Sequence, residues 1–172
     1  MDPHFPVHIR PAIPADATIL ADLGRSTFLE TYEKYQQDDN FYAYIAETFT
    51  RDKIAAEITA PGTGYYLALV GAEAVGYTRY RREVHAEGER AVVQRIYVRG
   101  DWQGRGVGRQ LMTVCTERAQ EEGFDGIYLT VWPVNTPAVA FYQHIGFTLA
   151  GTVMFQLRDV VEEDFLMYKP LA

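Results

Sequence analysis

The sequence predicts one α/β domain spanning residues 1–172, with a mixed, mostly antiparallel sheet flanked by helices. Three observations lead to that prediction. Apolar residues recur at helical spacing up to residue 58, and between residues 65 and 98 they alternate with polar residues. A strand–helix–strand–helix pattern and two final strands then complete the chain. A chain of 172 residues is long enough for one domain with a substantial buried core.

The first third of the chain is expected to hold one short strand and three helices. Pro14-Ala15-Asp16 opens the first helix, with Asp16 as its N-cap, and Thr50 caps the third, which Pro61-Gly62 ends. The predicted bounds are a strand at Val7–Arg10 and helices from Asp16 to about Tyr35, from Phe41 to Phe49 and from Arg51 to about Ile58.

Strands dominate the rest of the chain, with two helices between them. Gly71–Ala74 is predicted to turn a hairpin, and the polar segment Val84–Arg90 is predicted to be a connection. One amphipathic helix follows residue 106 and stops at Gly123, and a shorter one, capped by Asn135 or Thr136, ends at Gly146. The predicted strands are Tyr65–Val70, Val75–Arg81, Ala91–Val98, Ile127–Val131, Phe147–Leu157 and Phe165–Tyr168.

Composition disfavours several classes of partner. The net charge of −7, from 16 basic and 23 acidic residues, argues against nucleic acid, which needs a basic face, and favours a cationic substrate. No apolar run approaches the roughly 20 residues of a membrane helix, and the N-terminus lacks a signal-peptide pattern, so we expect a cytoplasmic protein that binds no membrane. Cys115, the single cysteine, is expected to be buried, and no His/Cys/Asp cluster predicts a metal site.

The glycine-rich segment Gln103-Gly104-Arg105-Gly106-Val107-Gly108 is the strongest chemical signal. It lies between a predicted strand and a predicted helix, where unpaired N–H groups and the helix dipole attract an anion such as phosphate. Glycines let the backbone approach that anion closely, and Arg105 and Arg109 add positive charge. The segment matches neither the Gly-Lys-Ser/Thr of a nucleotide P-loop nor the dinucleotide pattern of glycines. Taken by itself, it is also compatible with a flexible loop.

A second motif lies about one helix and one strand beyond this loop. Asn135–Phe147 matches the pattern Asn-x-x-Ala-x-x-Phe-Tyr-x-x-x-Gly-Phe, and Gln103–Gly108 matches Gln/Arg-x-x-Gly-x-Gly/Ala. In carrying both, the chain resembles the GNAT superfamily of acetyl-CoA-dependent N-acetyltransferases. The resemblance spans essentially the whole chain and is most specific from Gln94 to Phe147. It implies a GNAT-like sheet splayed between the strands Ala91–Val98 and Ile127–Val131, with acetyl-CoA in the opening.

The resemblance also implies which residues bind acetyl-CoA. The backbone of residues 96–98 would meet the pantetheine arm, and the glycine loop would bind the pyrophosphate. Asn135 would cap its helix and also contact the pantetheine arm. The residues expected at acetyl-CoA are Ile96, Tyr97, Val98, Gln103, Gly104, Arg105, Gly106, Val107, Gly108, Arg109, Asn135, Ala138 and Phe141.

Tyr142 is the expected catalytic residue, as general acid. The resemblance places the matching tyrosine at the thioester sulfur, where its hydroxyl would protonate the departing coenzyme A thiolate. The general base stays open, because relatives use a carboxylate near position 94 and this chain has Gln94, whose amide cannot take a proton. Gln94 could instead orient a water molecule, with a backbone carbonyl or a more distant acid accepting the proton.

A narrower resemblance concerns the acceptor. The segments Thr27–Tyr32, Arg95–Val98 and Val131-Trp132, and the ending Gly151-Thr152 with Phe155 and Asp164, are similar to PaiA-type spermidine/spermine acetyltransferases. This implies a small primary amine such as a polyamine, bound by Phe28, Glu30, Tyr32 and Gln94, with Glu33, Asp38 and Asp39 as further acidic candidates. Alternatives are acetylation of amino acids, protein N-termini or antibiotics, or an acyl-CoA-binding regulatory module without turnover. Both a monomer and a homodimer fit the sequence.

Overall fold

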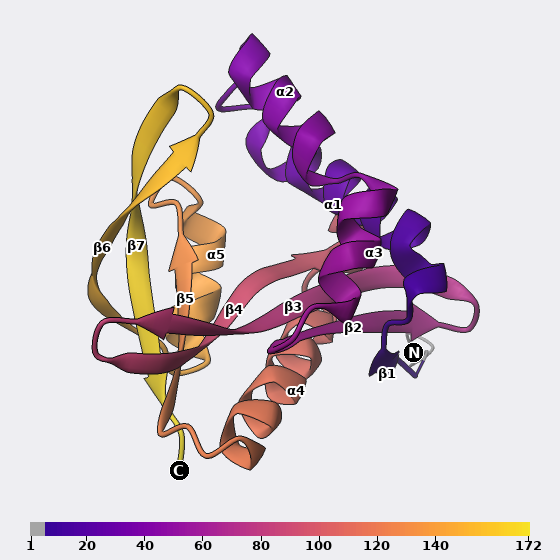
Figure 1. Cartoon of the computed structure of the whole chain (residues 1–172). Coiled ribbons are helices and arrows are strands. Elements are labelled where there is room, and N and C mark those ends of the chain that lie inside the picture. The colour runs from indigo at the N-terminus through magenta and orange to yellow at the C-terminus, as the bar shows by residue number, and fades with distance from the viewer. Residues whose placement is uncertain (1–5) are drawn as a thin grey trace.

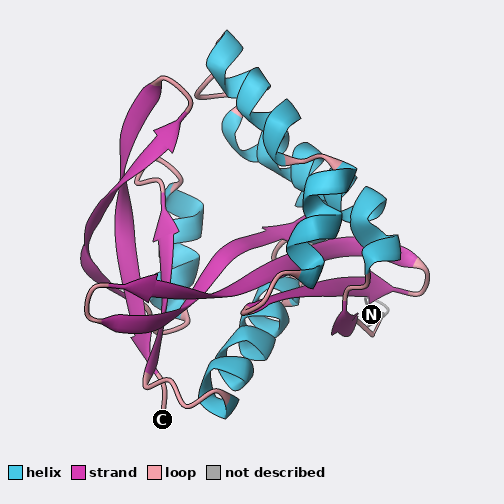
Figure 2. Ribbon diagram, viewed as in Figure 1, coloured by secondary structure: helices cyan, strands magenta, loops and turns pink. Residues whose placement is uncertain are grey.

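The computed structural model describes residues 6–172; residues 1–5, part of the N-terminal stretch in which no signal-peptide pattern occurs, lie outside the described part. Residues 6–172 form five α-helices and seven strands, and Figures 1 and 2 show how these elements are arranged. The strands are β1 (His8–Pro11), β2 (Thr63–Val70), β3 (Glu73–His85), β4 (Gly88–Val98), β5 (Gly126–Val131), β6 (Thr148–Leu157) and β7 (Val160–Pro170). The helices are α1 (Ala17–Tyr32), α2 (Asp39–Thr48), α3 (Arg51–Thr59), α4 (Val107–Glu121) and α5 (Thr136–His144), with 3₁₀ turns at Pro14–Asp16 and Gly100–Trp102.

The seven strands form one sheet in the order β1-β2-β3-β4-β5-β7-β6. Neighbouring strands pair antiparallel except β4 and β5, which run parallel at the centre. A parallel pair needs a crossover connection, and α4 provides it. The structure therefore confirms the predicted mixed, mostly antiparallel sheet.

Helices cover both faces of this sheet (Figure 2). Leu20 of α1 and Ile54 of α3 pack on β2 and β3 in one buried cluster. On the opposite face, Leu111 and Cys115 of α4 pack against β2, β3 and β5, and Tyr142 of α5 packs near β5 and β7. The starts of α4 and α5 therefore lie on the same side, next to the central pair of strands.

The ends of the first helices differ in detail from the prediction. Asp16 stands at the N-cap position of α1 but does not cap it. Its carboxylate accepts a hydrogen bond from the Ile13 N–H at 2.8 Å and pairs with Arg10 at 2.7 Å, so it ties the 3₁₀ turn to β1. Thr50 does cap α3, as predicted, with its Oγ1 accepting from the Lys53 N–H at 3.3 Å.

The connection predicted at Val84–Arg90 is wrong. β3 continues to His85 and β4 begins at Gly88, so only Ala86 and Glu87 form the turn. The end of this hairpin is exposed to solvent, as the 82% exposure of Val84 shows. Polar residues are compatible with a strand where its side chains face water. For the same reason β7 begins at Val160, earlier than predicted.

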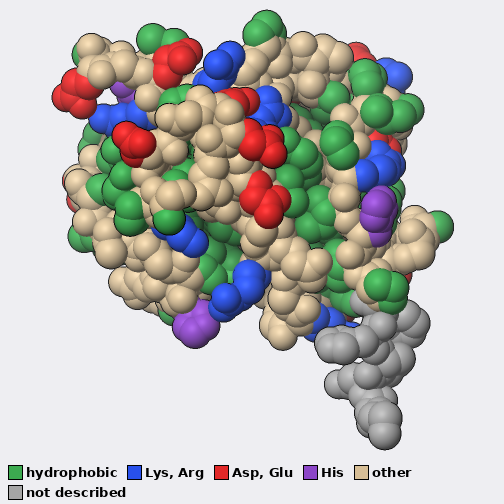
Figure 3. Space-filling view, turned by 90° about the horizontal axis from the view of Figure 1, so that it is seen from below, with side chains coloured by type: hydrophobic (Ala, Val, Ile, Leu, Met, Phe, Trp, Pro, Cys, Tyr) green, Lys and Arg blue, Asp and Glu red, His purple; other side chains and the backbone are tan. Residues whose placement is uncertain are grey.

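The surface carries both signs of charge. On the face shown in Figure 3, the coloured Lys and Arg side chains are interspersed with Asp and Glu, and in that view they form no continuous basic patch. Such a face does not provide the array of cations that a phosphate backbone requires. Among the helices of residues 6–172, none combines the length and the apolar character needed to cross a membrane.

Candidate active site

The loop between β4 and α4 holds backbone N–H groups without partners. Gly104 and Gly106 have φ of 74° and 82°, a left-handed conformation that strains residues with a Cβ. The first hydrogen bond of α4 runs from the Gln110 N–H to the Gly106 carbonyl at 3.1 Å, so the N–H groups of residues 107–109 have no partner within the helix. Together with the dipole of α4, these groups form a site for an anion.

The side chains of this loop have different positions. Gln103 donates from Nε2 to the carbonyl at the end of β4 at 3.1 Å, which closes the loop. Val107 is 1% exposed and anchors α4 in the core, while the guanidinium of Arg105 lies 4.9 Å from the ring centre of Trp102. Arg109 faces the cavity described below. The loop therefore offers its backbone and Arg109 to a ligand, whereas Val107 holds the helix in place.

The sheet opens next to this loop, as predicted. β4 and β5 pair only from Ala91–Val93 to Ile127–Leu129, although β4 continues to Val98. Gln94 marks the point of divergence, because Tyr80 of β3 pairs with Val93 and Arg79 pairs with Arg95, which leaves Gln94 as the extra residue of a β-bulge. Beyond it, one edge of residues 94–98 has no β5 partner and is free to bind a ligand.

One cavity of about 930 Å³ occupies this opening. The part lined by the β4 end, the glycine loop and α5 (residues 96–109 and 135–142) holds residues expected at acetyl-CoA and is called the donor half. The part lined by α1, α2, the segment between them, β6 and β7 (residues 27–44 and 155–164) holds most of the residues expected at the amine and is called the acceptor half. Of the predicted site residues, Arg105 and Val107 do not line it. Those that do are Phe28, Glu30, Tyr32, Gln94, Ile96, Tyr97, Val98, Gln103, Gly104, Gly106, Gly108, Arg109, Asn135, Ala138, Phe141 and Tyr142.

Tyr142 reaches the cavity from α5. Its ring is 8% exposed and packs between Phe141 and Phe147, with ring centres 5.4 Å and 5.9 Å away. Within residues 6–172, its hydroxyl makes no hydrogen bond and is free for a ligand. Burial raises the pKa of Tyr142, so the hydroxyl is protonated at neutral pH.

Asn135 connects the two halves of the cavity. Its Oδ1 accepts from the Ala138 N–H at 3.4 Å, which confirms the predicted N-cap of α5. Its Nδ2 donates to the Tyr32 hydroxyl of α1 at 3.3 Å. Close packing also fixes α5 against α4, because a Cβ on Gly108 would lie 3.3 Å from the Phe141 ring.

Comparison with known proteins identifies the family. The Acetyltransferase (GNAT) family model matches residues 21–147. The chain belongs to the GNAT acetyltransferases. It is 32% identical over 156 residues to an uncharacterised N-acetyltransferase of Lactobacillus delbrueckii subsp. lactis, covering 87% of this chain and 89% of that one. The protein is therefore an acetyl-CoA-dependent N-acetyltransferase, an acyltransferase enzyme.

Two other similar proteins match a smaller part of the chain or share only the fold. The chain is 35% identical over 111 residues to the mycothiol acetyltransferase of Catenulispora acidiphila, covering 62% of this chain and 35% of that one. The crystal structure of the PaiA N-acetyltransferase of Thermoplasma acidophilum in complex with coenzyme A has a TM-score of 0.80 at 20% identity, covering 96% and 99% of the two chains. At that identity the likeness establishes the GNAT fold, including the predicted α/β architecture.

Aromatic rings form one wall of the acceptor half. Phe28 of α1 lies at the centre, with ring centres 4.6 Å from Tyr32, 5.5 Å from Tyr44 and 6.5 Å from Tyr97. Trp132, after β5, packs on Tyr32 at 5.9 Å. The predicted residues Phe28 and Tyr32 are therefore together at the cavity, and both are held by their neighbours.

The four acidic candidates near α1 and α2 have different positions in the structure, and only one of them lines the cavity. Glu30 accepts from the Gly100 N–H at 3.3 Å and lines the cavity beside the β4–α4 loop. Glu33 accepts from the Tyr42 hydroxyl at 3.0 Å, and Asp38 caps α2. Glu33, Asp38 and the exposed Asp39 do not line the cavity. The prediction of cavity acids in this region therefore holds for Glu30 alone.

Sequence reasoning missed the acids that the sheet contributes. Glu83 of β3 and Glu162 and Asp164 of β7 line the acceptor half. Alternation along β7 places residues 162 and 164 on one face, which is a signal available from sequence. Which segment covers that face depends on the tertiary structure. Glu162 bonds to Gln36, which lies between α1 and α2 and is 126 residues away along the chain.

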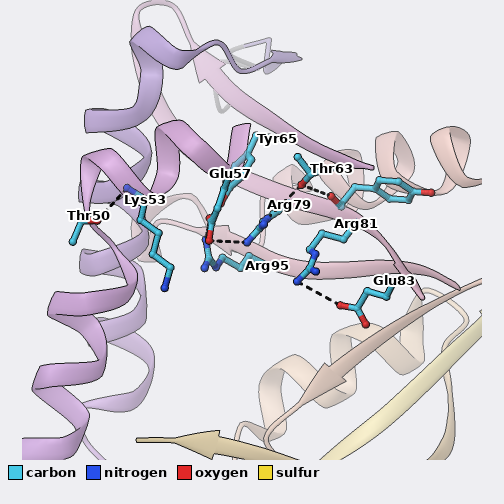
Figure 4. A network of polar contacts seen from close by, with 10 residues as sticks. Thr50, Lys53, Glu57, Thr63, Tyr65, Arg79, Arg81, Glu83 and Arg95 are labelled. Atoms are coloured by element: carbon cyan, nitrogen blue, oxygen red, sulfur yellow. Dashed lines mark hydrogen bonds and ion pairs between the residues drawn. The ribbon is translucent and has the colours of Figure 1, made fainter. Parts of the chain in front are cut away.

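A buried ion network lies beneath the acceptor half (Figure 4). Glu57 of α3 pairs with Arg79 of β3 and Arg95 of β4, each at 3.0 Å, and the Tyr65 hydroxyl also bonds to Glu57. Burial by itself raises the pKa of Glu57, but the charges of Arg95 and Arg79 and the hydrogen bond from Tyr65 lower it overall. The carboxylate therefore stays ionised and offsets one of the two guanidinium charges, and Arg95 lines the cavity.

Cys115 is buried, as predicted. Its side chain is 0% exposed, and the Thr78 Oγ1 lies 3.3 Å from its Sγ. Burial raises the pKa of this thiol to about 12. A thiol with that pKa is not a nucleophile at neutral pH. Among the described residues, no group of three or more His, Cys, Asp or Glu side chains is arranged to hold a metal ion.

Proposed function

We propose that this enzyme acetylates a primary amine of a small cationic molecule, with a polyamine as the leading class. The amine attacks the thioester of acetyl-CoA directly, and Tyr142 is the general acid that protonates the departing thiolate. The single observation that carries the proposal is the continuous cavity of about 930 Å³, which joins an anion site, a free tyrosine hydroxyl and an acid-lined pocket.

The donor half supports the assignment of acetyl-CoA to this cavity. The unpaired N–H groups of residues 107–109 and the charge of Arg109 suit a pyrophosphate, and the free edge of residues 96–98 suits an amide-containing arm. The residues fit the co-substrate because Gly104 and Gly106 leave open space where a Cβ would stand. Tyr142 lies at the other end of this half, where a thioester would follow the arm.

The acceptor half supports a cationic substrate. Glu83, Glu162 and Asp164 line it, and Arg95 pairs with Glu57. The rings of Phe28 and Tyr32 add surfaces that attract an ammonium group. Direct transfer is favoured over a covalent acyl-enzyme because the only cysteine, Cys115, is enclosed in the core.

An amine panel tests the proposal. Calorimetric titration with acetyl-CoA comes first, followed by measurement of thiol release with polyamines, amino acids, aminoglycosides and N-terminal peptides. We expect the polyamines to give the highest kcat/KM and mass spectrometry to show one added acetyl group. A preference for amino acids or neutral peptides would contradict the proposed acceptor, and acetyl-CoA binding without thiol release would favour a regulatory module.

A further inference from the structure

One carboxylate in the acceptor half has no partner. Asp164 is 7% exposed and lines the cavity, yet within residues 6–172 neither of its carboxylate oxygens forms a hydrogen bond or an ion pair. Its Oδ1 is fully enclosed. A buried charge without a partner lowers the stability of the fold, so its presence in a cavity points to a ligand that supplies the partner.

The other carboxylates of the cavity lining already have partners. They bond as follows: Glu30 to the Gly100 N–H, Glu83 to Arg81 and His85, and Glu162 to Gln36. Among the described residues that line the cavity, Asp164 is therefore the one carboxylate without any hydrogen bond or ion pair within the protein.

The groups around Asp164 leave it able to exchange a proton near neutral pH. Burial first, and then the charge of Glu162 on the same strand, raise the pKa of Asp164 to about 6. The hydroxyls of Tyr32 on α1 and Tyr44 on α2 are close enough for its charge to act on them, and burial is the main reason that their own pKa values are raised. Both tyrosines are therefore neutral.

Among the described residues around the acceptor half, Lys34 is the cation without an ion pair, and its ammonium, on an exposed side chain after α1, lies 4.9 Å from the Tyr35 ring centre. Arg95 of β4 pairs with Glu57 at 3.0 Å, and Glu83 of the β3–β4 hairpin pairs with His85 at 3.4 Å. β5 and β6 line the cavity with residues that do not titrate: Thr130, Val131, Phe155 and Leu157. His144, at the end of α5, also lines the cavity, so Asp164 is the candidate proton acceptor among the carboxylates.

The register of the sheet places Asp164 at the end of the opening. β5 ends at Val131, which pairs with Phe165, so Asp164 lies one residue beyond the last rung of that ladder. Trp132 leaves the sheet at this level, and both it and Asp164 line the same cavity as Tyr142. The carboxylate and the tyrosine hydroxyl therefore lie in the lining of one cavity and come from different elements.

Resting on the proposed function, we propose that Asp164 is the general base: its carboxylate binds the acceptor's ammonium group and takes the proton that the amine must lose before attack. The ammonium R–NH₃⁺ gives one proton to the carboxylate and becomes R–NH₂. A C–N bond then forms to the acetyl carbon, the C–S bond breaks, and the thiolate takes the proton of the Tyr142 hydroxyl. The new amide gives up its second proton to restore Tyr142, and Asp164 returns its proton to water. Asp164 thus supplies the base that Gln94 cannot provide.

The pH profile of the Asp164→Asn variant tests this role, with Glu163→Gln as the matched control. Glu163 is the exposed neighbour of Asp164 on the same strand, so its replacement removes an equal charge outside the cavity. We expect wild-type kcat/KM for the best panel amine to rise with pH through an apparent pKa near 6. Asp164→Asn should lower kcat/KM at pH 7 by about 10²-fold and remove that inflection, while Glu163→Gln matches the wild type.

Binding of an amine is the second readout. Spermidine, or the best panel amine, is titrated into each variant with coenzyme A bound, and acetyl-CoA affinity is measured separately. We expect Asp164→Asn to weaken amine binding at least about tenfold and to leave acetyl-CoA affinity unchanged.

The outcomes separate this inference from the proposed function. A wild-type rate and profile in Asp164→Asn would overturn the role of Asp164 and leave the acetylation of amines intact. Amine binding that depends on Asp164, without thiol release by the wild type, would overturn the proposed function and support the carboxylate site. Absence of both amine binding and thiol release in the wild type would overturn both.

Discussion

The two halves of the cavity differ in the groups that line them. The donor half uses backbone groups and small residues of one stretch of chain, from the bulge at Gln94 to α5, and its anion site is the start of a single helix. The acceptor half uses side chains from distant segments, as the bond between Gln36 and Glu162, 126 residues apart, illustrates. A site made of backbone is specified locally, whereas a site made of side chains depends on which elements meet.

The largest expected effect on activity comes from Tyr142, at which the two halves of the cavity meet. Tyr142→Phe should lower kcat by about 10²–10⁴-fold, because the thiolate then leaves without a proton donor. Acetyl-CoA affinity should stay within about twofold, since the ring still packs between Phe141 and Phe147. Thiol release and calorimetry measure the two quantities, and Tyr128→Phe, which is outside this cavity, is the control. Full activity in Tyr142→Phe would remove the tyrosine from the mechanism.

The buried ions beneath the acceptor half should be the most sensitive point for stability. Glu57→Gln leaves Arg79 and Arg95 without their carboxylate, and we expect a loss of about 3 kcal/mol in the free energy of unfolding. Glu47→Gln breaks the exposed pair with Arg158 and should change little. Urea denaturation compares the two variants, and equal losses would show that burial of the ions does not matter.

Replacement of Asp164 should have the opposite effect on stability to replacement of Glu57. Its pKa of about 6 in the folded protein is above the value near 3.9 of an unfolded chain, so the fold is favoured while Asp164 is protonated. That stability is present below pH ~4 and is lost as the pH rises through about 6. Asp164→Asn should therefore be more stable than the wild type at pH 7, by about 1–2 kcal/mol, with the advantage vanishing near pH 4. Denaturation at both pH values measures it, and a pH-independent difference would contradict the shifted pKa.

A smaller effect is expected in the backbone of the donor half. Gly106→Ala places a Cβ on a residue with φ of 82°, at a cost of about 1–2 kcal/mol, and should weaken acetyl-CoA binding about tenfold. Gly123→Ala, at φ of 83° after α4, carries the same strain outside the cavity and should leave affinity unchanged. If both variants lose affinity equally, the loop has no special role in binding.

The smallest expected effect concerns Cys115, which serves the core and neither half of the cavity. Treatment of the folded enzyme with iodoacetamide should leave activity unchanged, because the thiol is enclosed and its pKa is raised to about 12. Denatured protein, in which the thiol is exposed, is the positive control for the reagent. Inactivation that mass spectrometry traces to Cys115 in the folded enzyme would reopen a covalent mechanism.

The comparison of the halves also explains which expectations failed. Gly104, Gly106 and Asn135 have local roles, in positive φ or in capping, and their motifs located them correctly. Asp38 was expected among the acidic substrate contacts, but its role is local, because the structure makes it the cap of α2. The polar run Val84–Arg90 was mistaken for a connection because an exposed hairpin end is polar as well.

The sequence by itself determined the GNAT fold, the glycine loop at the start of α4 and the position of Tyr142 on α5, because helix starts, glycine conformations and strand periodicity depend on neighbouring residues. Only the tertiary structure decided that β7 faces α1 and α2, and with it the burial of Asp164. The physical reason is that desolvation and the absence of a partner are properties of the whole surroundings. An aspartate on a strand acquires them only when other elements close over it.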